Sequence, residues 1–123
     1  MEVTIKEKPF SFLVPASGSV CSQKFSLDKN VVRVLGLAIS ADYPQLLFYR
    51  GTQKIEINGE EIFEEEYESK MLMRGLAEKK FTDLGDGLFP GNGEVKILYK
   101  DTDNSNAPFV PYKVTLYLKI ELK

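Results

Sequence analysis

Histidine and tryptophan are absent from this chain of 123 residues. Histidine is the commonest general base and a frequent zinc ligand. Its absence therefore excludes Ser-His and Cys-His nucleophile pairs and nearly all catalytic zinc sites. Any acid–base chemistry would depend on carboxylates, lysine or tyrosine. The sequence predicts a protein that is not an enzyme and carries no cofactor.

Cysteine and long apolar runs are equally scarce. Cys21 is the single cysteine, so no disulfide can form within the chain, and a structural thiol is the favoured interpretation. No apolar run approaches the ~18 residues that span a bilayer. The first residues lack the basic and apolar segments of a signal peptide. We expect a protein that is made in the cytosol and does not enter a membrane.

The chain also lacks a basic excess. It has 16 basic and 18 acidic residues, a net charge of −2. Binding to nucleic acid depends on an excess of lysine and arginine that displaces counterions, so nucleic acid is not an expected partner. The 43% of hydrophobic residues suffices for a core, and the length predicts one domain spanning residues 1–123.

The dominant pattern in the sequence is an alternation of apolar and polar residues with a period of two. In residues 112–123 the apolar side chains fall on one side and lysine, threonine and glutamate on the other, which is typical of a strand with one buried face. Asn58-Gly59 tolerates the positive φ of a tight type I′ turn, which predicts a hairpin. Further strands are expected at 10–14, 19–27, 31–40, 46–49, 54–57, 60–63, 70–74 and 94–100.

This rhythm of short strands predicts an all-β fold, an antiparallel β-sandwich or jelly roll of about eight strands. Loops are expected at 84–93 and 101–111, where glycine, proline, aspartate and asparagine gather, and in the acidic segment 64–68. The strand order stays open, because a jelly roll and an immunoglobulin-like sandwich share this rhythm.

Residues with candidate chemistry are few. The glutamates between 60 and 68 could pair as in a glycosidase, but such a charge run is more typical of a solvated surface. Asp101 and Asp103 begin a segment that resembles a calcium loop. Its sixth position is Asn106 and its twelfth is Tyr112, in place of the required glycine and glutamate. No metal site is therefore expected, with Asp101 and Asp103 as the weak candidates.

The main functional clue is an excess of apolar residues. Segments 31–39 and 46–49 are apolar on both faces, whereas a sandwich strand normally exposes one face to water. Either the chain's own loops or another subunit must cover the second face. Tyr117 also lies on the polar side of its strand. The expected interface comprises Val31, Arg33, Leu35, Leu37, Ile39, Leu47, Tyr49 and Tyr117.

Aromatic residues at predicted loop edges support an alternative function. Tyr43, Phe89 and Phe109 could stack on sugar rings, as in a carbohydrate-binding module. Tryptophan, the residue best suited to such stacking, is missing, which makes this the second hypothesis.

Two segments carry a resemblance to a known group of proteins. Arg50 to Gly59 (RGTQKIEING) and Tyr99 to Asn104 (YKDTDN) resemble small β-sandwich virion proteins of phages that infect Bacteroidetes, such as accessory capsid and head-fibre proteins. The resemblance implies a structural subunit of the virion, repeated on a particle and assembled in the bacterial cytoplasm. Its partners would be copies of itself or other virion proteins.

Overall fold

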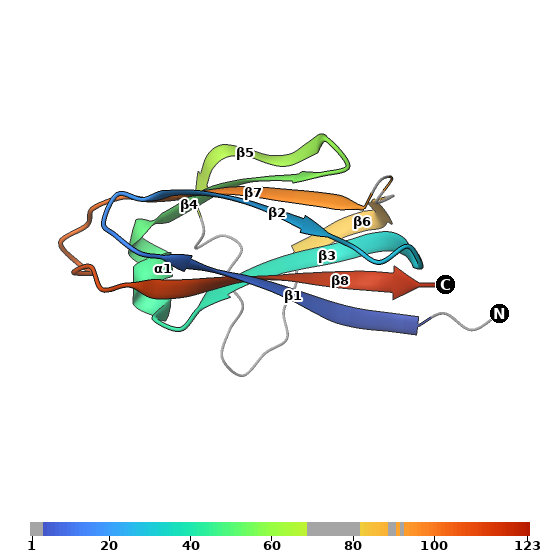
Figure 1. The fold of residues 1–123 in the computed structure, drawn as a ribbon, viewed down its shortest axis with the longest axis horizontal. Helices are drawn as coiled ribbons and strands as arrows, with labels where there is room; N and C mark the ends of the chain where they lie inside the picture. Colours follow the sequence, from blue (N-terminus) through green and yellow to red (C-terminus); the bar gives the residue numbers. More distant parts are fainter. Residues whose placement is uncertain (1–3, 69–81, 89–90, 92) are drawn as a thin grey trace.

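The computed structural model describes residues 4–68, 82–88, 91 and 93–123. Most of them form two antiparallel sheets that pack face to face, with one short helix, α1 (Pro44–Arg50), at one end (Figure 1). The first sheet contains, in spatial order, β1 (Thr4–Val14), β8 (Tyr112–Leu122), β3 (Val31–Ala41) and β6 (Thr82–Leu88). The second contains β2 (Val20–Ser26), β7 (Glu94–Asp101), β4 (Gly51–Ile57) and β5 (Glu60–Glu68). The predicted all-β sandwich is confirmed.

The strand order is that of a jelly roll. β1 pairs with β8, β2 with β7, β3 with β6 and β4 with β5, as in one long hairpin that has been rolled up into two sheets. Successive strands therefore lie in opposite sheets, apart from the β4–β5 hairpin. In an immunoglobulin-like sandwich the first two strands share a sheet. The topology thus decides between the two alternatives that the sequence left open.

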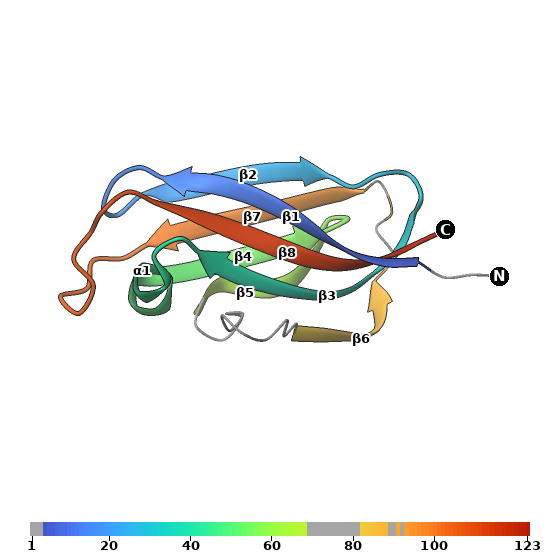
Figure 2. The same cartoon turned by 90° about the horizontal axis from the view of Figure 1, so that it is seen from below.

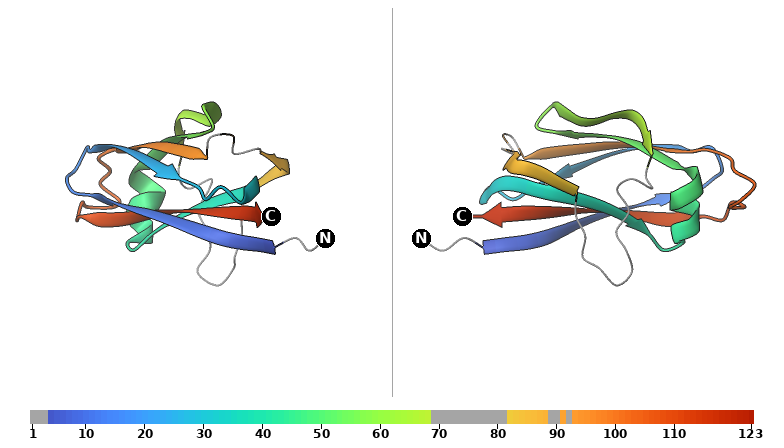
Figure 3. Two further views of the ribbon diagram at one scale, coloured as in Figure 1. Left: turned by 45° about the vertical axis from the view of Figure 1, so that its right-hand side comes forward. Right: turned by 180° about the vertical axis from the view of Figure 1, so that it is seen from behind.

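The connections gather at the two ends of the sandwich. Figure 2 shows the first sheet lying across the second, with α1 and the β1–β2 and β7–β8 connections together at one end. The start of β1 and the end of β8 lie at the other end (Figures 1 and 3). We call the former the α1 end; it comprises α1, the β1–β2 connection (15–19) and the β7–β8 connection (102–111).

One apolar core lies between the sheets, and it follows from the alternation in the sequence. In β8, Val114, Leu116 and Leu118 are fully buried while Lys113 is exposed, as predicted. Cys21 is buried in the same core. Burying an aliphatic side chain contributes roughly 1.5–3 kcal/mol. The core also includes Phe12, Val14, Val34, Leu37, Ile39, Leu46, Leu47, Ile55, Ile57, Val95 and Ile97.

The hairpin between β4 and β5 confirms the predicted turn. Asn58 and Gly59 have φ values of 54° and 75°, which are the two positive values that a type I′ turn requires. The prediction that residues 64–68 form a loop is wrong, because β5 continues to Glu68, which pairs with Thr52. The backbone of β4 offers hydrogen-bonding groups along its full length, and β5 satisfies them.

Two other expectations are also corrected. Residues 46–49 form helix rather than strand. Pro44 occupies the first turn, where its missing N–H is harmless, and Leu46, Leu47 and Arg50 share the buried face. Residues 84–88 of the predicted loop 84–93 belong instead to β6, which pairs with β3 at Val34, Gly36 and Leu37. The predicted strand 70–74 lies outside the described residues.

Gly93 and Gly59 provide a test of the backbone packing. Both have positive φ, but a Cβ on Gly93 would lie 3.1 Å from the Leu27 carbonyl oxygen, whereas a Cβ on Gly59 would have no atom within 4 Å. The Leu27 N–H also donates to the Gly93 oxygen at 2.8 Å, so this backbone cannot easily move.

We expect Gly59→Ala to lower the free energy of unfolding by about 1–2 kcal/mol, the cost of a left-handed alanine. Gly93→Ala should lower it by more, because of the added backbone clash. Urea denaturation followed by circular dichroism measures both variants. Equal losses would contradict the tight packing at Gly93.

Candidate functional site

The polar groups of the α1 end centre on a buried ion pair. Arg50, the last residue of α1, donates from Nη2 to Asp101 Oδ2 at 2.8 Å and from Nε to Oδ1 at 3.0 Å. Asp101 is the last residue of β7, and both side chains are completely buried. The planar guanidinium matches the carboxylate with two parallel hydrogen bonds, the strongest form of such a pair. The pair fixes the end of α1 to the end of β7.

Every oxygen of the Asp101 carboxylate is occupied. Tyr112 Oη donates to Oδ1 at 2.7 Å, and the Gly18 N–H donates to Oδ2 at 2.9 Å. Tyr112 Oη also lies 2.8 Å from Tyr99 Oη. Because the single Tyr112 proton goes to Asp101, Tyr99 must donate in that contact. One carboxylate thus joins the β1–β2 connection, α1, β7 and β8.

The remaining donors of Arg50 extend this network. Nη1 donates to the Ala107 carbonyl at 2.9 Å and Nη2 donates to Ser17 Oγ at 2.7 Å. The Phe109 ring covers the guanidinium, with 5.2 Å between the ring centroid and Cζ. Within the described residues no buried side-chain oxygen or nitrogen lacks a hydrogen-bond partner. The site is therefore a closed structural network.

The electrostatics hold each group in one protonation state. Burial alone would raise the pKa of Asp101, but the hydrogen bonds from Arg50, Tyr112 and the Gly18 N–H hold that pKa below its ordinary value of 3.8. Burial, followed by the effects of Tyr99 and Asp101, raises the pKa of Tyr112 far above its ordinary range. At neutral pH the network thus contains a fixed carboxylate and a fixed phenol, and these groups stabilise the fold rather than exchange protons with a substrate.

The two weak metal candidates lie in different environments. Asp101 is buried and accepts four hydrogen bonds, so its oxygens are not available to a cation. The Asp103 side chain is 93% exposed and lies 3.4 Å from Arg50 Nη1. Among the residues that the structure describes, no group of three or more aspartate, glutamate, cysteine or histidine side chains could hold a metal ion.

The expected interface is only partly at the surface. Val31, Leu37, Ile39 and Leu47 belong to the core, so these side chains do not lie at the surface, where an interface would require them. Val31, Leu37 and Ile39 lie on β3, between β8 and β6, and Leu47 lies on the buried face of α1, so the chain's own core covers all four side chains.

The other four predicted interface residues retain some exposure. Arg33 is exposed and lies 3.8 Å from Glu121. Leu35 and Tyr117 are half-buried. A Cβ on Gly87 of β6 would lie 3.0 Å from Leu35, so β6 covers part of this face. Tyr49 is the one predicted interface residue that is both apolar in character and well exposed.

Tyr49 belongs to a group of exposed aromatic residues at α1 that the sequence analysis assigned to two different candidate sites. We define this aromatic patch as Tyr43, Phe48 and Tyr49, which are 43%, 46% and 45% exposed. The rings of Phe48 and Tyr49 meet edge to face, with centroids 5.0 Å apart. Phe48 and Tyr49 face outward because the opposite side of α1 is buried. The helical spacing of residues 46–50 is the signal in the sequence that separates the buried face of α1 from its exposed face.

The alternative ligand-binding residues are not assembled into one platform. Tyr43 is exposed, but Phe109 is half-buried against Arg50 and meets Tyr112 edge to face at 6.0 Å. Phe89 lies outside the described residues. Phe109 thus serves to cover the ion pair.

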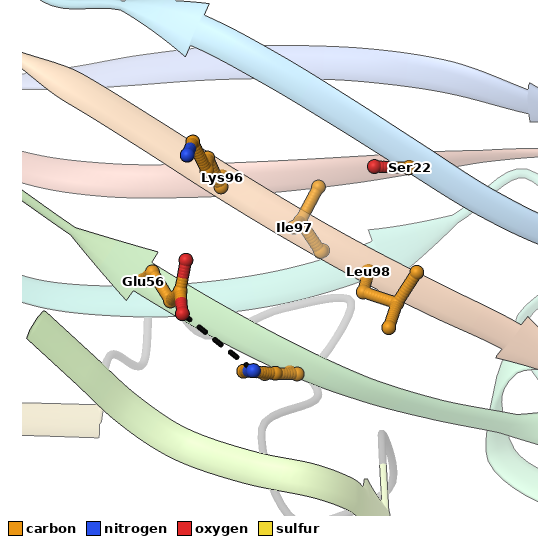
Figure 4. Close-up of a pocket in the computed structure, with 6 residues that line it drawn as sticks. Ser22, Glu56, Lys96, Ile97 and Leu98 are labelled. Carbon is orange, nitrogen blue, oxygen red and sulfur yellow. Dashed lines mark ion pairs between the residues drawn. The ribbon is translucent and has the colours of Figure 1, made fainter. Parts of the chain in front are cut away.

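A shallow depression of about 190 Å³ lies on the outer face of the second sheet (Figure 4). Its charged side chains are paired: Lys54 lies 3.6 Å from Glu56, and Lys96 lies 3.1 Å from Glu94. The depression is lined by Ser22, Lys54, Glu56, Lys96, Ile97 and Leu98. Because each of its charged side chains already has an ion-pair partner, the depression gives no clear preference for an anionic or a cationic ligand.

Comparisons with known proteins add no relative. No family model, curated protein or solved structure matches the chain. No helix among the described residues has the length and apolar character needed to cross a bilayer.

Removing one partner of the ion pair tests how much the pair contributes to the stability of the fold. Asp101→Leu leaves Arg50 buried without a counter-charge, and we expect the free energy of unfolding to fall by about 3–5 kcal/mol. Asp101→Leu combined with Arg50→Met should recover part of this loss, because no charge stays buried, although the Tyr112 hydroxyl, the Gly18 N–H and the Ala107 carbonyl lose their partners. Asp103→Ala is the control, with an expected change of at most about 0.5 kcal/mol. A double variant no more stable than Asp101→Leu would contradict the argument.

The depressed pKa of Asp101 predicts a pH dependence. A carboxyl group whose pKa is lower in the folded state stabilises the fold fully above its ordinary pKa of 3.8, and this stabilisation is lost as the pH falls through the folded-state value. The stability difference between wild type and Asp101→Asn should therefore be larger at about pH 7 than at about pH 2. Urea unfolding across this range measures it, and a constant difference would contradict the shifted pKa.

Proposed function

We propose that this protein is a non-enzymatic structural subunit that docks on a larger assembly, as a phage virion component of the accessory capsid or head-fibre kind. The observation that carries the proposal is the aromatic patch, exposed on a helix whose other face is anchored in the core. The jelly-roll strand order, which is common in viral capsid domains, and the resemblance of residues 50–59 and 99–104 to virion proteins support it.

The patch has the composition and the support of a docking surface. Tyrosine and phenylalanine are enriched in the buried parts of protein interfaces. The buried side chains Leu46 and Leu47 and the ion pair of Arg50 hold α1 in place. A surface that is already ordered loses little conformational entropy on binding. The docking surface proposed from the structure is thus the outer face of α1 rather than the apolar run of β3.

The size of the patch favours docking on a repeated array over a stable dimer. An aromatic side chain carries ~150–250 Å² of surface, so three such residues exposed by nearly half offer roughly 300 Å². A stable interface buries about 800 Å² on each partner. A single patch therefore provides a weak attachment, which becomes effective when many copies bind one particle.

Carbohydrate binding remains the second hypothesis and has less support. Stacking on a sugar uses the flat face of an aromatic ring. The planes of Phe48 and Tyr49 are inclined by 76°, so these two rings do not form a common platform. Tyr43 is the only one of the three predicted sugar-binding residues that the structure describes as exposed.

Co-sedimentation with phage particles tests the proposal. Particles purified by density gradient from the organism that encodes the chain should contain the protein in many copies, and purified wild-type protein should re-bind particles that lack it. The variant with Phe48→Ser and Tyr49→Ser should lose this binding. Ile5→Ser, which changes a residue that is 52% exposed on β1 near the opposite end, should retain it.

Light scattering coupled to size-exclusion chromatography gives the accompanying measurement. We expect the free protein to have the mass of one chain at micromolar concentrations, because the patch is small. Absence of the protein from the particles would contradict the virion role. A stable oligomer that persists in the patch variant would contradict docking through α1.

A further inference from the structure

An acidic side chain lies beside the aromatic patch. The Thr102 N–H donates to the Arg50 carbonyl at 2.9 Å, and Asn104 Nδ2 donates to the Tyr49 carbonyl at 3.2 Å. Asp103 lies between these two residues in the chain, so its backbone is fixed next to the end of α1. Its side chain is 93% exposed. Tyr49 and Asp103 therefore face solvent from adjacent positions.

Both side chains attract the same kind of group. The face of an aromatic ring carries negative potential, and an ionised carboxylate only accepts hydrogen bonds. Arg50 Nη1 donates a long hydrogen bond of 3.4 Å to Asp103 Oδ1, but the charge of Arg50 is already balanced by its closer, bidentate contact with Asp101. Asp103 thus adds negative charge at the rim of the patch. A planar cation with several N–H donors suits this pair of groups.

The buried ion pair of the same site shows an arginine side chain that contacts both an aromatic ring and a carboxylate. The guanidinium of Arg50 lies between the Phe109 ring at 5.2 Å and the Asp101 carboxylate at 2.8 Å. Tyr49 and Asp103 offer the same two kinds of group, an aromatic ring and a carboxylate, on neighbouring backbone segments and exposed to solvent.

We propose that Tyr49 and Asp103 form a receptor for an arginine side chain of the docking partner, which presents it on a polypeptide segment with neighbouring apolar residues. This inference rests on the proposed docking function and names the chemistry of the partner. The apolar neighbours of the arginine would contact Phe48 and Tyr43, while the guanidinium stacks on Tyr49 and pairs with Asp103.

Charge argues for such a segment over a second copy of this chain. Two copies joined symmetrically through the patch would place the Asp103 carboxylates of both copies around one interface, with no added positive charge from the patch to offset them. Asp42, which is also exposed, adds a second negative charge on the amino-terminal side of α1. A basic partner instead gains favourable contacts with both Asp103 and Asp42.

A peptide titration monitored by NMR tests the receptor on the full-length protein. The probe is a blocked Leu-Arg-Leu peptide, and its control is the same peptide with citrulline, which has nearly the shape of arginine but no charge. We expect the arginine peptide to shift the amide signals of Phe48, Tyr49 and Asp103, and to bind about fivefold more tightly than the citrulline peptide.

Variants assign the effect to the two residues. Asp103→Asn should weaken binding of the arginine peptide by about the same factor and leave the citrulline peptide unaffected. Tyr49→Ala should weaken binding of both peptides. Asp28→Asn, which removes an exposed carboxylate from the β2–β3 connection, is the charge-matched control and should change neither. Equal binding of the two peptides, or an unchanged arginine affinity in Asp103→Asn, would overturn the receptor.

The binding of the variants to phage particles distinguishes the arginine receptor from the docking function. If Asp103→Asn re-binds particles as well as wild type while the patch variant does not, the arginine receptor is wrong and the docking function stands. If both variants bind normally, the docking function is wrong. Loss of binding in both variants, together with the predicted peptide preference, supports both proposals.

Discussion

The α1 end depends on the bidentate pair between Arg50 and Asp101. A guanidinium and a carboxylate removed from water are strongly destabilising unless each finds a full set of partners. Here those partners come from the β1–β2 connection, β8 and the β7–β8 connection, including Ser17, Gly18 and Tyr112. The pair therefore requires the connections to close over it, and the closed connections in turn keep water from the pair. The outer face of α1 takes its fixed position from this mutual dependence.

The pair also separates two kinds of surface at one end of the molecule. Its inner side contains fully satisfied polar groups, in which Asp101 and Tyr112 stay in single protonation states. Its outer side presents Tyr49 and the exposed Asp103 on the same backbone segments. A fully hydrogen-bonded interior therefore supports exposed aromatic and acidic side chains at the same end of the molecule.

The sequence predicted the parts of the fold that local chemistry determines. The alternation in β8 and the positive φ preference of Asn58-Gly59 are local properties, and both predictions were confirmed. Residues 46–49 were misassigned because four consecutive apolar residues fit a buried strand and a short helix equally well. The ion pair was not foreseen, because Arg50 and Asp101 are 51 residues apart and arginine is rarely buried. Strand order likewise arises from pairings that no local pattern reveals.

The pairing of the first strand with the last has a kinetic consequence. Ser11 and Thr115 share a hydrogen bond at 2.9 Å although 104 residues separate them, and all of β1 is paired in this way with β8. Closing so long a loop lowers the entropy of the chain before any stabilising contact between the two strands has formed. Folds rich in such contacts therefore form slowly. During synthesis β1 leaves the ribosome first but has no partner until β8 follows. Pro9, which has no N–H to offer a foreign strand, interrupts the exposed edge of β1 during that interval.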